Sequence, residues 1–234
     1  MFGFGKREMP EPPHLESVYV CETGLVSPDN QDNVFLSAER GIFCVADGVG
    51  GGAEGAKASA TVCHELNLMT RGLGDNFAQR VQAMRVGLVD ANAVIYAYAR
   101  EHSYEVMGST AAVLLFDPED GSRAAVVHVG DSRVYRVRHG LYECITHDHR
   151  IPGGNSLTRA IGARPTLACE VDEIDVARGD RFLVCTDGVT SVVSDGRIAA
   201  FVGAGPIESA AERLAAEVVK CGAPDNYSFI VISA

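Results

Sequence analysis

The dipeptide Asp-Gly ends an apolar run twice in this chain, at Asp47-Gly48 and again at Asp187-Gly188. Both runs have the length and composition of a buried β-strand. A strand that delivers a carboxylate at its end, followed by a glycine that permits close backbone approach, is suited to hold a hard divalent cation. The repetition therefore indicates that two distant parts of the chain contribute to one metal site.

Two further acidic residues stand beside strand-like runs, Asp225 before residues 228–232 and Asp32 within an Asn-Gln-Asp-Asn sequence. Asp-Gly and Asp-Asn are also ordinary turn dipeptides that need carry no chemistry. A two-residue hairpin turn should lead into another strand, whereas Gly48 leads into a glycine cluster and then a helical pattern. The sequence therefore favours a cluster of four aspartates over four unrelated turns.

Composition limits the class of protein. The chain has 234 residues, 47% of them hydrophobic, which is enough for one large core. We expect a tail over residues 1–14 and a single domain over residues 15–234, monomeric by default. No signal peptide or membrane-spanning run is apparent, and the seven cysteines include no Cys-x-x-Cys pair, so a cytoplasmic protein is predicted. The net charge of −11 argues against nucleic-acid binding.

The order of predicted elements is strands, helices, strands and a closing helix and strand. Residues 77–98 carry an apolar stripe at steps of three and four, which predicts an amphipathic helix. A second helix is predicted near residues 207–218, with Pro206 in its first turn. Such runs of strands and helices favour an α+β fold. The remaining elements are strands near 17–25, 33–37 and 41–46, a helix over 54–70, a four-strand antiparallel meander over 109–116, 124–129, 134–137 and 141–145, and a strand over 228–232.

The glycine cluster also fits nucleotide-binding patterns. Residues 48–53 match G-x-G-x-x-A after a strand and before a helix. A dinucleotide-binding unit needs a strand after its first helix, but a second helix follows here. A P-loop needs a lysine directly after its last glycine, and Ala56 follows Gly55. Both patterns are therefore weak.

Eight motifs, in order, resemble those of the metal-dependent protein phosphatases, the type 2C serine/threonine phosphatases, in their bacterial form. They span most of the chain and begin with Val-Ala-Asp-Gly-Val-Gly-Gly. The resemblance implies a four-layer α/β/β/α sandwich, in which helix pairs flank a central antiparallel β-sandwich. The motifs occupy residues 45–51, 56–59, 108–110, 128–135, 146–149, 157–162, 187–190 and 225–226.

The resemblance also implies roles for the acidic residues. Asp47 would bridge two Mn²⁺ or Mg²⁺ ions, Asp187 and Asp225 would complete the ligands of one ion, and the Gly48 carbonyl would help to bind the other. Asp32 would orient the attacking water. The implied activity is hydrolysis of phosphoserine and phosphothreonine on a protein partner, the target of a bacterial kinase, by water bridging the two ions.

Asp131 and the histidine pair at residues 147 and 149 each have more than one interpretation. Asp131 is either part of a hairpin turn or, by resemblance, a ligand of a weaker third ion together with Asp187. His147 and His149 share a face if residues 147–149 are a strand, but no third soft ligand follows, which argues against zinc. One of these histidines is also a candidate general acid.

The chain departs from the family pattern in three places. Ser27 stands where an arginine normally grips the substrate phosphate. Gln31 replaces an acidic residue beside the second ion, which it can still approach with a carbonyl oxygen. The segment of residues 150–156 replaces a longer flap. The alternative function is therefore a weak or inactive phosphatase-like module that binds or regulates a partner.

Overall fold

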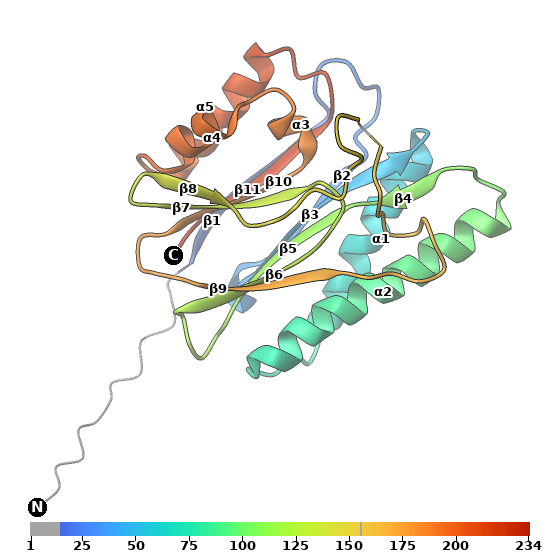
Figure 1. The fold of residues 1–234 in the computed structure, drawn as a ribbon, viewed down its shortest axis with the longest axis horizontal. Helices are drawn as coiled ribbons and strands as arrows, with labels where there is room; N and C mark the ends of the chain where they lie inside the picture. The colour runs from blue at the N-terminus through green and yellow to red at the C-terminus, as the bar shows by residue number, and fades with distance from the viewer. Residues whose placement is uncertain (1–14, 155) are drawn as a thin grey trace, which may run out of the picture.

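Two antiparallel β-sheets lie face to face at the centre of the protein, and helices cover both outer faces (Figure 1). The coordinates are a computed structural model that describes residues 15–154 and 156–234. The predicted tail, residues 1–14, lies outside the described residues. The predicted α+β sandwich is confirmed.

One sheet has five strands in the order β1-β11-β10-β7-β8. The other has six: β2-β3-β5-β6-β9 form a continuous order, and the short β4 pairs with the end of β3. The strands of the first sheet are β1 Glu16–Glu22, β11 Tyr227–Ser233, β10 Arg181–Cys185, β7 Arg133–Arg138 and β8 Leu141–Cys144. Those of the second are β2 Asp32–Ser37, β3 Ile42–Gly50, β5 Ala111–Phe116, β6 Arg123–Val129, β9 Glu170–Asp175 and β4 Met107–Ser109.

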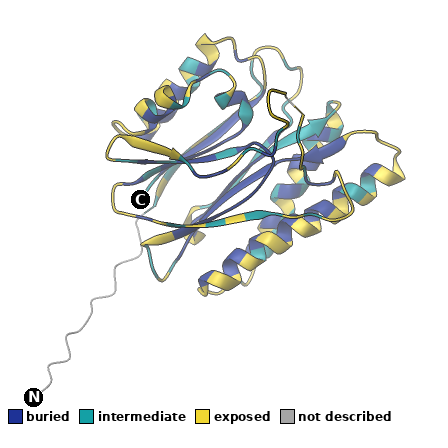
Figure 2. Ribbon diagram, in the orientation of Figure 1, coloured by how far each residue is buried: buried dark blue, intermediate teal, exposed yellow. Residues whose placement is uncertain are grey.

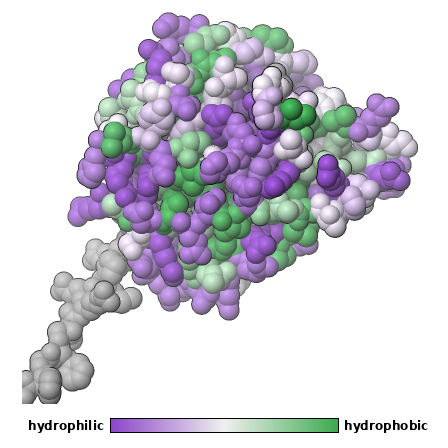
Figure 3. Space-filling model, in the orientation of Figure 1, coloured by the Kyte–Doolittle hydropathy of each residue, from purple (hydrophilic) through white to green (hydrophobic). Residues whose placement is uncertain are grey.

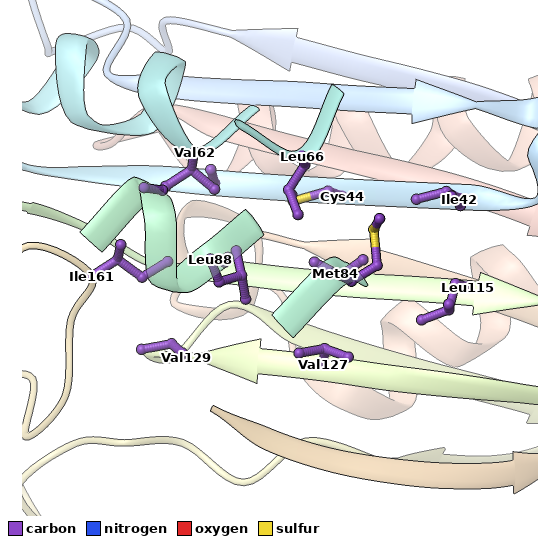
Figure 4. Close-up of a cluster of buried hydrophobic side chains, with 14 of the residues drawn as sticks. Ile42, Cys44, Val62, Leu66, Met84, Leu88, Leu115, Val127, Val129 and Ile161 are labelled. Carbon is purple, nitrogen blue, oxygen red and sulfur yellow. The ribbon is translucent and has the colours of Figure 1, made fainter. Parts of the chain in front are cut away.

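Helices α1 (Ala53–Thr70) and α2 (Phe77–Glu101) pack on the outer face of the six-stranded sheet. Helices α4 (Asp195–Val202) and α5 (Ile207–Lys220) lie on the other side, against the five-stranded sheet. The predicted stripe of α2 is confirmed, because the apolar residues that compose it are buried against the sheet: Phe77, Val81, Met84, Leu88, Ala91 and Ile95. Met84 and Leu88 are labelled in Figure 4. Two short elements are the 3-10 helix Ala38–Arg40 and α3, Asp187–Thr190.

Apolar side chains fill three layers, one under each helix pair and one between the sheets. Successive residues of β3 alternate between them: Cys44 faces the helices, whereas Phe43 and Val45 face the other sheet. A strand covered on both faces must be apolar throughout, which explains the uninterrupted run before Asp47. The central strands β3, β5, β6, β10 and β11 are correspondingly buried, whereas the edge strand β8 and the outer helix faces are exposed (Figure 2). Hydrophilic residues dominate the face drawn in Figure 3.

The predicted meander is wrong. Strands β5 and β6 form a hairpin in one sheet, but the chain then crosses to the other sheet, where β7 pairs with β8 and β10. Strand β9 pairs with the edge of β6 and was not predicted. Pro206 is the N-cap residue of α5 and does not lie in its first turn.

Across residues 15–154 and 156–234, none of the helices combines the length with the apolar character needed to cross a bilayer.

Candidate metal centre

Asp32 and Asp47 face each other across neighbouring strands at one end of the sandwich. The antiparallel register of β2 and β3 pairs these two residues directly. Asp32 is 4% exposed, and its Oδ2 accepts a hydrogen bond from Thr186 Oγ1 at 2.8 Å. Because Thr186 directly follows β10 of the other sheet, this hydrogen bond connects the two sheets beside the carboxylate pair.

Asp187 and Asp225 come to the same place from the five-stranded sheet. Asp187 begins α3 directly after β10, and Asp225 precedes the neighbouring β11. Backbone and side-chain hydrogen bonds between Thr186 and Ser228 hold the two segments in register. The structure therefore brings together the four aspartates that the sequence singled out, from four separate segments.

Asp131 joins this group through the turn in which the chain crosses between the sheets. The Thr110 hydroxyl lies 2.7 Å from that of Ser132, and it also accepts a hydrogen bond from the backbone N–H of Asp47. Gly130 has φ +103°, and a Cβ there would lie 2.6 Å from the Thr110 side chain, so only glycine suits this position. The hairpin alternative for Asp131 is therefore wrong.

The electrostatics of the cluster are those of carboxylates whose negative charge is only partly compensated. Burial, assisted by the neighbouring aspartates, raises the pKa of Asp32 to about 7 and that of Asp131 to about 6. Burial and the charges of Asp32, Asp187, Asp131 and Asp225 raise the pKa of Asp47 well above its ordinary value. Burial likewise raises the pKa of Asp187.

This donor set fits a hard divalent cation. Carboxylate oxygens of Asp47, Asp131 and Asp187 lie within 4.8 Å of one another. Atoms that surround one cation at 2.0–2.6 Å have separations of this size, and oxygen-only ligands are those that Mg²⁺ and Mn²⁺ prefer. Positive charge in the centre would relieve the repulsion that raises the pKa values.

Arg150 already supplies one positive charge to this cluster. Its Nε lies 2.6 Å from Asp131 Oδ2, and its Nη2 donates a hydrogen bond to Asp187 Oδ2 at 2.8 Å. This contact could not be predicted from the sequence, because nothing in the local pattern indicates which carboxylates Arg150 meets.

The divergent loop of residues 23–31 is held by Asn226, which is 5% exposed. Its Oδ1 accepts a hydrogen bond from the Gln31 N–H, and its Nδ2 donates to the carbonyls of Thr23 and Asp29. The Gln31 Oε1 is buried without a hydrogen-bond partner within the described residues, and it lies against Gly55 of α1. The asparagine that follows Asp225 is thus a positioning residue, a role that sequence reasoning missed.

His149 does not pair with His147. His147 is exposed, and its carbonyl accepts from His128 Nε2, whereas His149 is buried and stacks on the His128 ring with centroids 4.8 Å apart. Glu170 lies 3.1 Å from His149 Nε2. Although His128, His149 and Glu170 are close enough to share an ion, stacked rings aim their nitrogen lone pairs in parallel rather than at one point.

His149 instead supports the turn that carries Asp131. Its Nδ1 accepts a hydrogen bond from the Gly130 N–H at 3.1 Å, and its backbone N–H donates to the Gly130 carbonyl at 2.9 Å. The His149 ring therefore stabilises the backbone of the turn at Gly130, next to Asp131. The general-acid role stays a prediction.

Gly188 allows the close approach of α3 to β11, on which the spacing of Asp187 and Asp225 depends. A Cβ at Gly188 would lie 1.8 Å from the Asn226 carbonyl oxygen. We expect Gly188→Ala to lower the free energy of unfolding by about 1–3 kcal/mol and to weaken Mn²⁺ binding, because the backbone must shift. Chemical denaturation and calorimetric titration measure the two effects. Gly196→Ala in α4, where a Cβ meets nothing within 4 Å, is the control; equal stability of both variants would contradict the prediction.

Comparison with known proteins agrees with this geometry. The family model described as protein phosphatase 2C matches residues 23–221. The serine/threonine protein phosphatase PstP of Mycobacterium tuberculosis is 32% identical over 90% of this chain, which spans only 43% of PstP. Protein phosphatase PhpP of Streptococcus pneumoniae is 24% identical, with 94% of this chain and 97% of PhpP covered.

Solved structures give the same result. PppA, described as a key regulatory component of T6SS in Pseudomonas aeruginosa, superposes with a TM-score of 0.90 at 30% identity, covering 95% of this chain and 99% of PppA. The catalytic domain of PstP in complex with two manganese ions has a TM-score of 0.81 at 30% identity, covering 94% and 97%. Sequence, fold and carboxylate cluster thus agree that this chain belongs to the protein phosphatase 2C family.

Proposed function

We propose that this protein is a serine/threonine protein phosphatase that depends on two Mn²⁺ or Mg²⁺ ions. The convergence of Asp32, Asp47, Asp187 and Asp225 from both sheets is the observation that carries the proposal. The PstP structure with two manganese ions supports it. The alternative, a module without activity, gains nothing from a cluster of carboxylates that repel one another.

In the proposed centre Asp47, Asp187 and Asp225 would hold the ions through their carboxylates, and the Gly48 carbonyl and Gln31 would supply further oxygen ligands. The bound ions supply Lewis-acid stabilisation of the phosphate charge and lower the pKa of water. Asp32 would orient the attacking water, and the Thr186 hydroxyl fixes the orientation of the Asp32 carboxylate.

The substrate is a phosphoprotein, and we infer that it is the target of a bacterial serine/threonine kinase. The acidic chain, with a net charge of −11, is unsuited to nucleic acid as a partner. All seven cysteines are free, which supports a reducing location such as the cytoplasm. A monomer is the default.

The test is manganese-dependent hydrolysis of p-nitrophenyl phosphate and of a phosphothreonine peptide by the purified protein. Asp187→Asn is the negative control, since it removes a ligand of the proposed centre. Turnover by the wild type that the control lacks, and that chelation abolishes, supports the enzyme. Rates equal to the control at millimolar Mn²⁺ would favour the binding module.

The first motif gives a separate prediction. Gln31→Glu should tighten Mn²⁺ binding about tenfold, because an added negative charge near an ion is worth about 1.4 kcal/mol at the effective dielectric of a partly buried site. Calorimetric titration measures it, with Gln79→Glu on the exposed face of α2 as the control. Ser27→Arg should lower the Michaelis constant without this change in metal affinity. An unchanged affinity in Gln31→Glu would mean that residue 31 does not face an ion.

A further inference from the structure

Arg150 spans two carboxylates of the centre that belong to different sheets. Its Nε is 2.6 Å from Asp131 in the crossover turn, and its Nη2 is 2.8 Å from Asp187 at the start of α3. The side chain of Asp131 is 4% exposed, that of Asp187 is 17% and that of Arg150 is 25%. Because little water reaches these groups, their attraction is stronger than that of a surface pair.

The backbone around Arg150 is fixed on both sides. Arg150 forms a β-bridge with Leu157, and the preceding His149 bonds with Gly130 on one side and Thr158 on the other. These contacts hold Arg150 over the carboxylate cluster, beside the turn that carries Asp131. A planar guanidinium with several donors suits two separate carboxylates.

A metal ion and this guanidinium cannot occupy the same place. The carboxylate oxygens of Asp131 and Asp187, together with Asp47, form the group that is close enough to hold one ion. Arg150 already contacts one carboxylate oxygen of Asp131 and one of Asp187, which are two of these three residues. A cation bound to Asp131 and Asp187 would have to displace a positive charge of the chain itself, and would meet its repulsion.

We propose that Arg150 takes the place of a third metal ion in this protein. Its single positive charge partly offsets those of Asp131 and Asp187, so the centre takes two ions, and Asp131 acts as a positioning residue that holds Arg150. The third ion that the family resemblance suggests binds here only when the arginine is removed. This inference rests on the proposed two-metal centre and adds the number of ions to it.

The test counts the manganese ions bound, by titration followed with electron paramagnetic resonance of free Mn²⁺. We expect about two equivalents for the wild type and about three for Arg150→Met, which keeps the apolar stem and removes the charge. Asp131→Asn in the Arg150→Met background should return the count to about two. Arg159→Ala, which removes another carboxylate-paired arginine of the same region, should leave it at two.

Three equivalents in the wild type, or two in a folded Arg150→Met variant, would overturn the inference and leave the proposed function intact. No bound manganese in any variant would overturn both. Should Arg150→Met not fold, Asp131→Asn alone decides. An unchanged count of two supports Arg150 as the occupant, and a drop of one equivalent shows that Asp131 already holds an ion.

Discussion

Replacing Asp47 by asparagine is expected to abolish manganese-dependent hydrolysis while making the metal-free protein more stable. Asp47 is the proposed ligand common to both ions, so its loss should lower the rate by at least about 1,000-fold, equivalent to about 4 kcal/mol of transition-state stabilisation. The gain in stability has a separate cause. Burial and four neighbouring aspartates oppose the charge of Asp47, which raises its pKa, and asparagine carries no charge.

The two effects are measured in one preparation. Activity is followed with saturating Mn²⁺, and thermal unfolding is followed in a chelator at pH 8, where we expect the melting temperature of Asp47→Asn to exceed that of the wild type by several degrees. Asp90→Asn, at an exposed position of α2, is the matched control and should change neither quantity. A metal-free variant less stable than the wild type would show that Asp47 is compensated by something other than metal.

The parts of the fold that the sequence predicts are those determined by local periodicity. The stripe of α2 and the apolar runs of β3 and β10 follow directly from which faces of an element are covered. The aspartates at the ends of these strands could be singled out because each interrupts such a run. Their convergence needed the additional evidence of motifs in the order of a known family.

Other features depend on long-range pairing, which local patterns do not carry. The pattern around Asp131 predicts a tight turn but not whether the next strand joins the same sheet. Strand β9 was not predicted because four of its six residues, Glu170–Asp175, are acidic, and acidic residues are uncommon in strands. At the edge of a sheet, such charged residues protect the strand from pairing with other chains. Arg150 and Asn226 act on residues far away in the chain, so neither role could be derived from spacing.

The stability of the metal-free protein should fall as the pH rises from 5 to 7. Asp32 binds its proton more tightly in the folded state, with a pKa of about 7, than in the unfolded state, where the ordinary value is 3.8. Between these values the folded protein holds more protons, so each rise in pH favours unfolding. Asp32 alone then contributes a loss of about 2 kcal/mol over this interval. Asp131, with a pKa of about 6, acts in the same direction.

One buried group opposes this trend. Burial lowers the pKa of His128, so its contribution to stability is lost as the pH falls through its unfolded value. Asp175, whose pKa two arginines lower to about 2, loses its contribution only in more acidic solution, below the interval considered. With several carboxylates against one histidine, the net slope from pH 5 to 7 should remain negative.

Saturating Mn²⁺ should reverse the sign of this slope. The ions bind only deprotonated ligands, so metal affinity rises with pH and stabilises the folded state increasingly. Urea unfolding at pH 5, 6 and 7, with chelator and with Mn²⁺, measures both slopes. Asp32→Asn in chelator should show a flatter dependence than the wild type, because it lacks the titrating group while retaining His128. A metal-free slope that is zero or positive would contradict the account of the centre as a group of carboxylates that repel one another until cations bind.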